Sequence, residues 1–76
     1  MKVKVELMPG LRQQRKEKLE LELPEGTTVR AMLLRLDFKE GEMEPLRVFV
    51  NGELVGLNKA LKDGDDIWVG MVIGGG

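Results

Sequence analysis

The chain has 76 residues, a formal net charge of −1, and neither cysteine nor histidine. This length allows one small domain. The missing residue types exclude disulfides, thiolate metal sites, cysteine nucleophiles and imidazole bases, and with them most intrinsic catalysis. The near-neutral charge lacks the cationic excess of a general nucleic-acid binder. With 42% hydrophobic and 33% charged residues, the chain is expected to be a folded, soluble globule rather than an extended disordered chain, and we do not expect it to be an enzyme.

The N-terminal segment and the apolar stretches bear on the cellular location of the protein. MKVKVELMPG alternates lysine with apolar residues, whereas a signal peptide has an uninterrupted apolar run after its basic start. The apolar stretches are too short to span a bilayer. We therefore expect a cytoplasmic protein that binds neither a membrane nor a nucleic acid.

Two strands are expected near the start of the chain. Val3, Val5 and Leu7 alternate with polar residues, which is the period of a strand with one buried face. Residues 16–23 repeat this alternation, and the proline and glycine between the two runs are typical of a connection. The two strands are expected to pair as an antiparallel hairpin.

A helix is expected after the break at residues 24–26. Thr27 or Thr28 can cap it, because a hydroxyl oxygen can accept from the first unpaired helical amides. Apolar residues then follow at i, i+3, i+4 and i+7, namely Val29, Met32, Leu33 and Leu36. This stripe predicts a helix that packs one face against the sheet and ends near Asp37 or Phe38.

The second half of the chain is expected to complete the sheet. Alternation predicts strands at residues 46–50, 53–56 and 67–71. Asn51-Gly52 is a two-residue turn signal, because both positions tolerate positive φ. Between the strands we expect an exposed acidic loop at 39–45, a brief helical turn at 57–61 and a polar turn at 62–66.

This order of elements predicts an α+β protein with one helix packed across one face of a mixed sheet of four to five strands. A hairpin, a helix and then strands from another part of the sheet is the order of the β-grasp, or ubiquitin-like, fold. Residues 1–73 are expected to form this domain, and residues 74–76 a flexible glycine tail.

Large side chains and charges elsewhere are candidates for binding. Phe49 and Trp68 alternate with the buried positions of their strands, so we expect both to point away from the core as a partner site. A covering loop, or a register shifted by one residue, is the alternative. The basic residues Arg12, Arg15, Lys16 and Lys18 and the acidic residues Glu40, Glu42 and Glu44 are interpreted as solvated charges, with no metal site expected.

The resemblance that unites these features is to the MoaD/ThiS family of ubiquitin-like sulfur carriers. LELPEGTTVRAML at 21–33 is similar to the strand, turn and helix start of that family. VFVNGELV at 48–55 is similar to its central hairpin, and LKDGDDIWV at 61–69 to the turn into its last strand. Gly75-Gly76 matches its terminal diglycine, although Gly74 adds a third glycine and no proline precedes it.

The resemblance implies that the protein is a substrate of other enzymes and binds no cofactor itself. An E1-like partner of the MoeB/ThiF type would use ATP to adenylate the carboxylate of Gly76, and a sulfur donor would convert it to a thiocarboxylate. The sulfur would pass to a synthase subunit in molybdopterin or thiamine biosynthesis, and the sequence leaves the branch open. We expect Phe49, Trp68, Val72 and Ile73 to contact the partner.

The residues of the tail suit this role, and three other interpretations stay open. Without Cβ atoms, Gly74, Gly75 and Gly76 can thread a narrow channel and leave the terminal carbonyl accessible. The same end could instead be conjugated to lysines, as in a ubiquitin-like modifier. It could also be a frayed chain end. An interaction domain that stacks RNA on its aromatic residues is the third alternative.

Overall fold

The computed structural model describes residues 1–9, 11 and 18–71. Within them the chain forms five strands, one α-helix and a short 3-10 helix. The strands are β1 (Lys2–Leu7), β2 (Lys18–Glu22), β3 (Leu46–Val50), β4 (Glu53–Val55) and β5 (Asp66–Met71). The helices are α1 (Val29–Arg35) and η1 (Glu40–Glu42). The predicted strands are therefore all present among the described residues, with boundaries that differ by a few residues.

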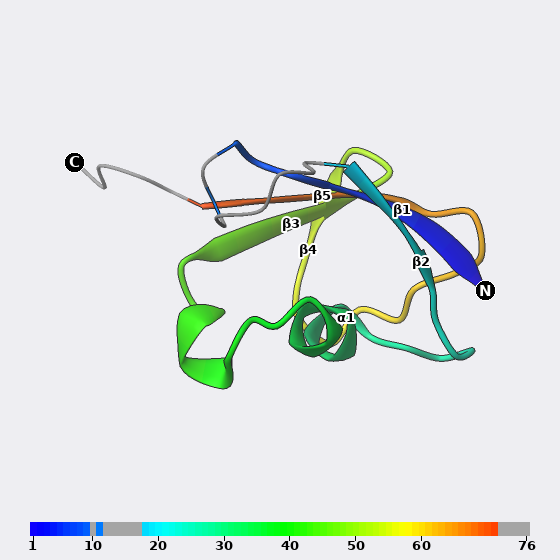
Figure 1. Cartoon of the computed structure of the whole chain (residues 1–76), viewed down its shortest axis with the longest axis horizontal. Coiled ribbons are helices and arrows are strands. Elements are labelled where there is room, and N and C mark those ends of the chain that lie inside the picture. Colours follow the sequence, from blue (N-terminus) through cyan, green and yellow to red (C-terminus); the bar gives the residue numbers. More distant parts are fainter. Residues whose placement is uncertain (10, 12–17, 72–76) are drawn as a thin grey trace.

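The strands form one mixed sheet in the order β2-β1-β5-β3-β4. β1 and β5 run parallel, whereas the other neighbouring strands are antiparallel. Figure 1 shows α1 lying across one face of this sheet, and the described residues place no helix on the opposite face. This two-layer arrangement confirms the predicted α+β fold, and it places β5 in the centre with a hydrogen-bonded neighbour on each side.

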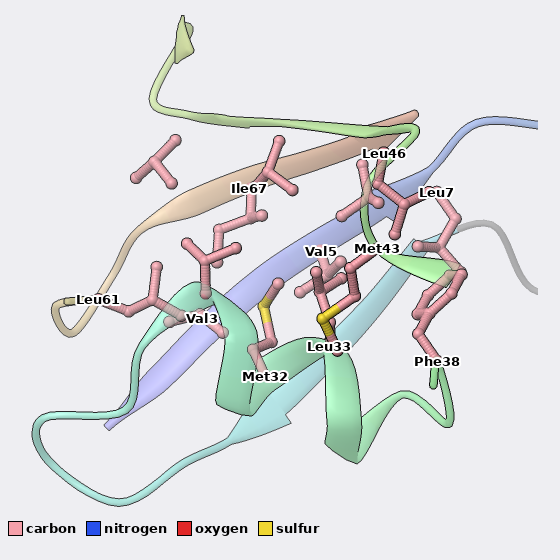
Figure 2. Close-up of a cluster of buried hydrophobic side chains, with 14 of the residues drawn as sticks. Val3, Val5, Leu7, Met32, Leu33, Phe38, Met43, Leu46, Leu61 and Ile67 are labelled. Carbon is pink, nitrogen blue, oxygen red and sulfur yellow. The ribbon is translucent and has the colours of Figure 1, made fainter. Parts of the chain in front are cut away.

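The core fills the space between α1 and the sheet (Figure 2). Its strand residues occupy alternate positions, because successive side chains of a strand point to opposite faces. The buried apolar residues are Val3, Val5, Leu7, Leu23, Val29, Met32, Leu33, Phe38, Met43, Leu46, Val48, Val50, Leu61, Ile67 and Val69. The predicted apolar stripe of the helix is buried at Val29, Met32 and Leu33 and half-buried at Leu36.

Residues 57–61 form backbone hydrogen bonds with the start of α1 and the residues just before it. Thr28 caps the helix by accepting a hydrogen bond from the backbone N–H of Ala31 at 3.2 Å. The carbonyl oxygens of Leu57 and Lys59 accept bonds from two further amides of the first turn, each at 2.9 Å. The prediction of a helical turn at 57–61 is therefore wrong: this segment makes a turn and a bridge whose backbone supplies the missing partners of the helix.

The end of α1 is also fixed by its backbone. Asp37 has a φ of 73°, and the N–H groups of Asp37 and Phe38 donate to the carbonyl oxygens of Leu34 and Leu33. This is the Schellman pattern, in which a residue in the left-handed region ends the helix. Phe38 then enters the core. The helical residues end at Arg35, slightly before the predicted end.

The acidic segment after α1 is more ordered than the predicted loop. Its glutamates are exposed as expected, and Glu40 forms an ion pair with Arg30. However, residues 40–42 form η1, and Met43 behind it is only 2% exposed. Met43 closes the end of the core near Leu46 and Phe38 (Figure 2). Because the other residues of the segment are mostly polar, the sequence did not indicate that Met43 would be buried.

A side-chain network joins the β3–β4 turn to the turn before β5. Asn51 donates from Nδ2 to Asp65 Oδ1 at 2.9 Å, and its Oδ1 accepts from the N–H of Asp66 at 2.9 Å. Asp65, which is buried, also accepts from the N–H of Lys62 at 2.8 Å. The network therefore joins the C-terminal end of β3 to the N-terminal end of β5.

Among the described residues, no helix combines the length and the apolar character needed to cross a membrane.

Replacing Met43 with alanine is expected to destabilise the fold by roughly 2 to 5 kcal/mol, because a buried methionine leaves a cavity that closes only in part. Urea unfolding measures this change. Glu44→Ala, at an exposed neighbouring position, is the control and should leave the midpoint nearly unchanged. Equal midpoints for the two variants would contradict the assignment of Met43 to the core.

Asn51→Gly is expected to destabilise the fold by about 1 to 3 kcal/mol, because it removes one partner of the buried Asp65 carboxylate. Glycine accepts the φ of 53° at this position, so the change isolates the side-chain bonds from the backbone conformation. Thermal unfolding measures the effect. Asn58→Gly, in an exposed turn, is the matched control. If Asn58→Gly lowers the unfolding temperature as much as Asn51→Gly does, the network does not contribute to the stability of the fold.

Candidate functional site

The candidate site is the face of the sheet opposite α1, which we call the outer face. Phe49 on β3 and Trp68 on β5 lie opposite each other in the strand register. Their neighbours on the same strands, including Val48 and Val69, are buried in the core. The two aromatic residues therefore point away from the core, as predicted. Their rings meet edge to face, with centroids 5.8 Å apart and planes at 65°.

A third apolar residue extends this pair to the edge of the sheet. Leu54 on β4 lies opposite Phe49, and its side chain is 56% exposed. Phe49 and Trp68 are each half-buried. Sequence reasoning missed Leu54, although the two-residue turn at Asn51-Gly52 fixes the register that places it there. Leu54, Phe49 and Trp68 form what we call the aromatic row, which crosses β4, β3 and β5.

Gly70 has an unexpected place in this site. It follows Trp68 by two positions on β5 and so shares the outer face. A Cβ atom added to Gly70 would lie 2.1 Å from Trp68 Cη2 and 2.3 Å from Cζ3, which no real contact permits. The indole ring thus lies directly over the Gly70 backbone and buries it. Because Gly70 has no positive φ, the ring, rather than the backbone conformation, excludes a side chain there.

Charged residues occupy the rest of the outer face. Lys4 on β1 lies between Asp66 on β5 and Glu20 on β2, and Glu6 lies between Trp68 and Lys18. Neighbouring strands thus present opposite charges to each other. A groove of about 630 Å³ is lined by residues of this charged part together with Phe49 and Trp68; Lys4 and Glu20 are among the charged residues. The site therefore combines an apolar wall with a charged wall whose signs alternate.

The described residues contain no candidate metal site. None of them form a group of three or more acidic, histidine or cysteine side chains that could hold a metal ion. Glu40, Glu42 and Glu44 are exposed, and Glu40 pairs with Arg30. Lys18 is exposed on β2, whereas the other members of the basic cluster, Arg12, Arg15 and Lys16, lie outside the described residues.

The predicted tail also lies outside the described residues. This applies to Val72 and Ile73, predicted to contact a partner, and to Gly74, Gly75 and Gly76. The last described residue is Met71, at the end of β5. Met71 is 38% exposed and lies on the same side of β5 as the buried Ile67 and Val69, so it belongs to the inner face of the sheet.

Comparisons with known proteins agree with this architecture. The ThiS family model matches residues 5–76. SAMP1 from Haloferax volcanii has a TM-score of 0.82 at 19% identity, with both chains covered completely. A putative molybdopterin converting factor subunit 1 from Pyrococcus furiosus has a TM-score of 0.77 at 29% identity, covering 95% of this chain and 98% of that one.

A third solved structure contains a partner. It is a complex of subunits 1 and 2 of molybdopterin-converting factor from Helicobacter pylori; the matched chain is 26% identical, with a TM-score of 0.66 and full coverage of both chains. No curated protein matches the chain. Because the family model spans nearly all residues, the chain belongs to the ThiS family, and the five-stranded sheet and α-helix of its described residues have the β-grasp fold of the MoaD/ThiS ubiquitin-like sulfur carriers.

Proposed function

We propose that this protein carries sulfur as a thiocarboxylate on Gly76 and delivers it to a synthase. The observation that carries the proposal is the ThiS match, which extends through residue 76 and so includes Gly75-Gly76. The likeness to molybdopterin converting factor subunit 1 from Pyrococcus furiosus, at 29% identity, supports the same class. The carrier itself is not the catalyst in this proposal, because it contributes only the reacting carboxylate.

The proposed chemistry has two steps. The ionised carboxylate of Gly76 attacks the α-phosphorus of ATP, and the bond to pyrophosphate breaks, so that an acyl-adenylate and pyrophosphate form. Hydrosulfide then attacks the acyl carbon; if a persulfide attacks instead, the acyl disulfide that forms is cleaved at its S–S bond by a thiol, which leaves as a disulfide with the donor's sulfur. AMP leaves with the bonding electrons of the C–O bond, and a thiocarboxylate remains. An E1-like partner of the MoeB/ThiF type supplies the ATP site and orients both reactants.

The body of the protein has the role of presenting this end. β5 is hydrogen-bonded to β1 on one side and to β3 on the other, and Met71 at its end is the last described residue before the C-terminal segment. Five extended residues span at most about 17 Å. That reach is sufficient to bring the terminal carboxylate into an active site that contacts the edge of the domain, provided that the partner also binds the body.

The accepting partner is proposed to be a synthase subunit. The Helicobacter pylori complex joins subunit 1 of molybdopterin-converting factor to subunit 2, and the subunit 1 relative is 26% identical to this chain. A related subunit is a suitable acceptor here, in molybdopterin or in thiazole synthesis. The aromatic row is the proposed contact for partners, because it is the apolar part of a face on which the described residues place no helix.

Incubation with the E1-like enzyme of the same genome, MgATP and hydrosulfide is expected to convert the carrier to its thiocarboxylate. Intact mass spectrometry measures the gain that corresponds to replacement of one oxygen by sulfur. Deletion of Gly75-Gly76 should abolish the gain, because the reacting carbonyl is then withdrawn from the partner's site. Gly41→Ala is the control, since no atom lies within 4 Å of a Cβ at that exposed position. A full mass gain in the deletion variant, or none in the wild type, would contradict the proposal.

Conjugation to proteins is a second candidate. SAMP1 from Methanosarcina acetivorans, a small archaeal modifier protein, is 26% identical to this chain, with a TM-score of 0.75 and coverage of 99% and 96%. The same adenylate could be attacked by a lysine amine of another protein, which would displace AMP and form an isopeptide bond.

Cells that express an affinity-tagged form of the chain distinguish the two functions. A modifier is expected to give covalent adducts that survive denaturation and whose lysine-containing peptides carry the C-terminal glycine residues. The variant without Gly75-Gly76 should give none. If tagged protein is recovered only at the mass of the free chain or its thiocarboxylate, conjugation is refuted and the carrier role alone is supported.

A further inference from the structure

Asn51 is followed by a glycine, and asparagine loses its side-chain amide most readily in this dipeptide. The backbone nitrogen of the following residue can attack Cγ of the asparagine, and glycine leaves that nitrogen unhindered because it has no Cβ atom. Asn58, the other asparagine of the chain, is followed by Lys59, whose Cβ hinders the same attack. Asn51 and Gly52 are both exposed, so water reaches them. Chemistry alone therefore marks Asn51 as the reactive asparagine.

The backbone of the β3–β4 turn keeps the two reacting atoms apart. Asn51 has a φ of 53° and Gly52 a φ of 84°, which are the two positive values of a type I′ turn. In the left-handed region that Asn51 occupies, ψ is roughly +30 to +60°. The bond to the next nitrogen then points nearly opposite to Cβ, whereas ring closure needs this nitrogen and Cγ on the same side. The folded turn thus has the wrong conformation for the attack.

Side-chain hydrogen bonds hold the amide of Asn51 as well. Its Nδ2 donates to Asp65 Oδ1 and its Oδ1 accepts from the N–H of Asp66, each at 2.9 Å. Asp65 is 8% exposed and also accepts from the N–H of Lys62, so the acceptor that holds Nδ2 is itself fixed. Both bonds to the amide must break before it can rotate toward the nitrogen of Gly52. Attack therefore requires the turn to open and the network to break.

We propose that Asn51 is a deamidation site that the folded network suppresses and that opening of the β3–β4 turn releases. The nitrogen of Gly52 loses its proton and bonds to Asn51 Cγ; the Cγ–Nδ2 bond breaks, and ammonia leaves after Nδ2 gains a proton, so that a succinimide ring forms. Water then adds to one of the two ring carbonyl carbons and breaks its bond to the ring nitrogen. The product is aspartate or isoaspartate at position 51. This inference does not depend on the proposed function.

The product cannot restore the network. In aspartate, a carboxylate oxygen replaces Nδ2, so two acceptors would face each other where Asn51 Nδ2 and Asp65 Oδ1 are now 2.9 Å apart. Two carboxylates at this distance repel each other. Isoaspartate instead adds a methylene group to the main chain, so the two-residue turn no longer joins β3 to β4 in the same register. Deamidation is therefore a one-way change that marks chains whose turn has opened.

Incubation of the wild-type chain in mildly alkaline buffer, with and without denaturing guanidinium chloride, tests the proposal. Mass spectrometry of the intact chain measures the gain that corresponds to replacement of NH by O, and fragmentation locates it. Asn51 should deamidate at least about tenfold more slowly in the folded chain, an effect that two hydrogen bonds can supply. Asn58 should change little in either state. Equal rates at Asn51 in the folded and unfolded chain, or a faster reaction at Asn58, would overturn the inference.

Asp65→Ala separates the local network from overall stability, because it removes the acceptor of Asn51 Nδ2 and leaves the turn sequence intact. Met43→Ala is the matched control, since it weakens the core without changing the network. At equal free energies of unfolding, Asp65→Ala should deamidate about threefold faster or more, because one of two bonds is lost. Asp65→Asn, with one acceptor oxygen for two donors, replaces it if it does not fold. Equal rates would assign protection to global folding and refute the role of the network.

Asn51→Asp reproduces one product directly. It should lower the unfolding temperature more than Asn51→Gly does, because it places a second carboxylate against Asp65 instead of only removing a donor. Adding Asp65→Asn should recover much of the loss, because the amide and the carboxylate have then exchanged positions and can bond again. If Asn51→Asp is as stable as the wild type, or if the double variant shows no recovery, deamidation does not disrupt the network and this part of the inference is wrong.

Discussion

The alternation of side chains along β5 is the constraint on which the rest of the structure depends. Ile67 and Val69 point into the core, and Trp68 and Gly70 point to the outer face. Because β5 is hydrogen-bonded to β1 and β3, its register also decides which side chains of those strands face the core. A shift of one residue would bury the tryptophan and expose two core residues, so the hydrophobic core fixes which face is available to a partner.

The two faces of the sheet thus have different roles. The inner face is closed by α1, whose ends are held by Thr28 and the Schellman turn at Asp37. The outer face has the aromatic row beside a charged region of alternating sign. A body of this kind suits a protein that presents its own chain end, because β5, the last described element of the chain, is hydrogen-bonded to a strand on each side.

Much of this architecture could be predicted from the sequence, because strand alternation and turn residues are local signals. The strands, the helix and the outward direction of Phe49 and Trp68 are confirmed. The helical turn at 57–61 was wrong because its backbone groups bond to α1, a contact that local patterns do not encode. Met43 and Gly70 were missed for a similar reason: one is an apolar residue among glutamates, and the other is explained only by a ring two residues away. The roles predicted for Val72, Ile73 and the glycines stay predictions.

The central claim is that the terminal carboxylate of Gly76 is the group that reacts, on a body that performs no chemistry. Hydroxylamine trapping during incubation with the E1-like enzyme and MgATP tests it most directly, because hydroxylamine converts an acyl-adenylate to a stable hydroxamate. Mass spectrometry of the proteolysed carrier should locate the hydroxamate on Gly76, and only when both enzyme and ATP are present. A hydroxamate on an aspartate or glutamate side chain, or none on the carrier at all, would contradict the account.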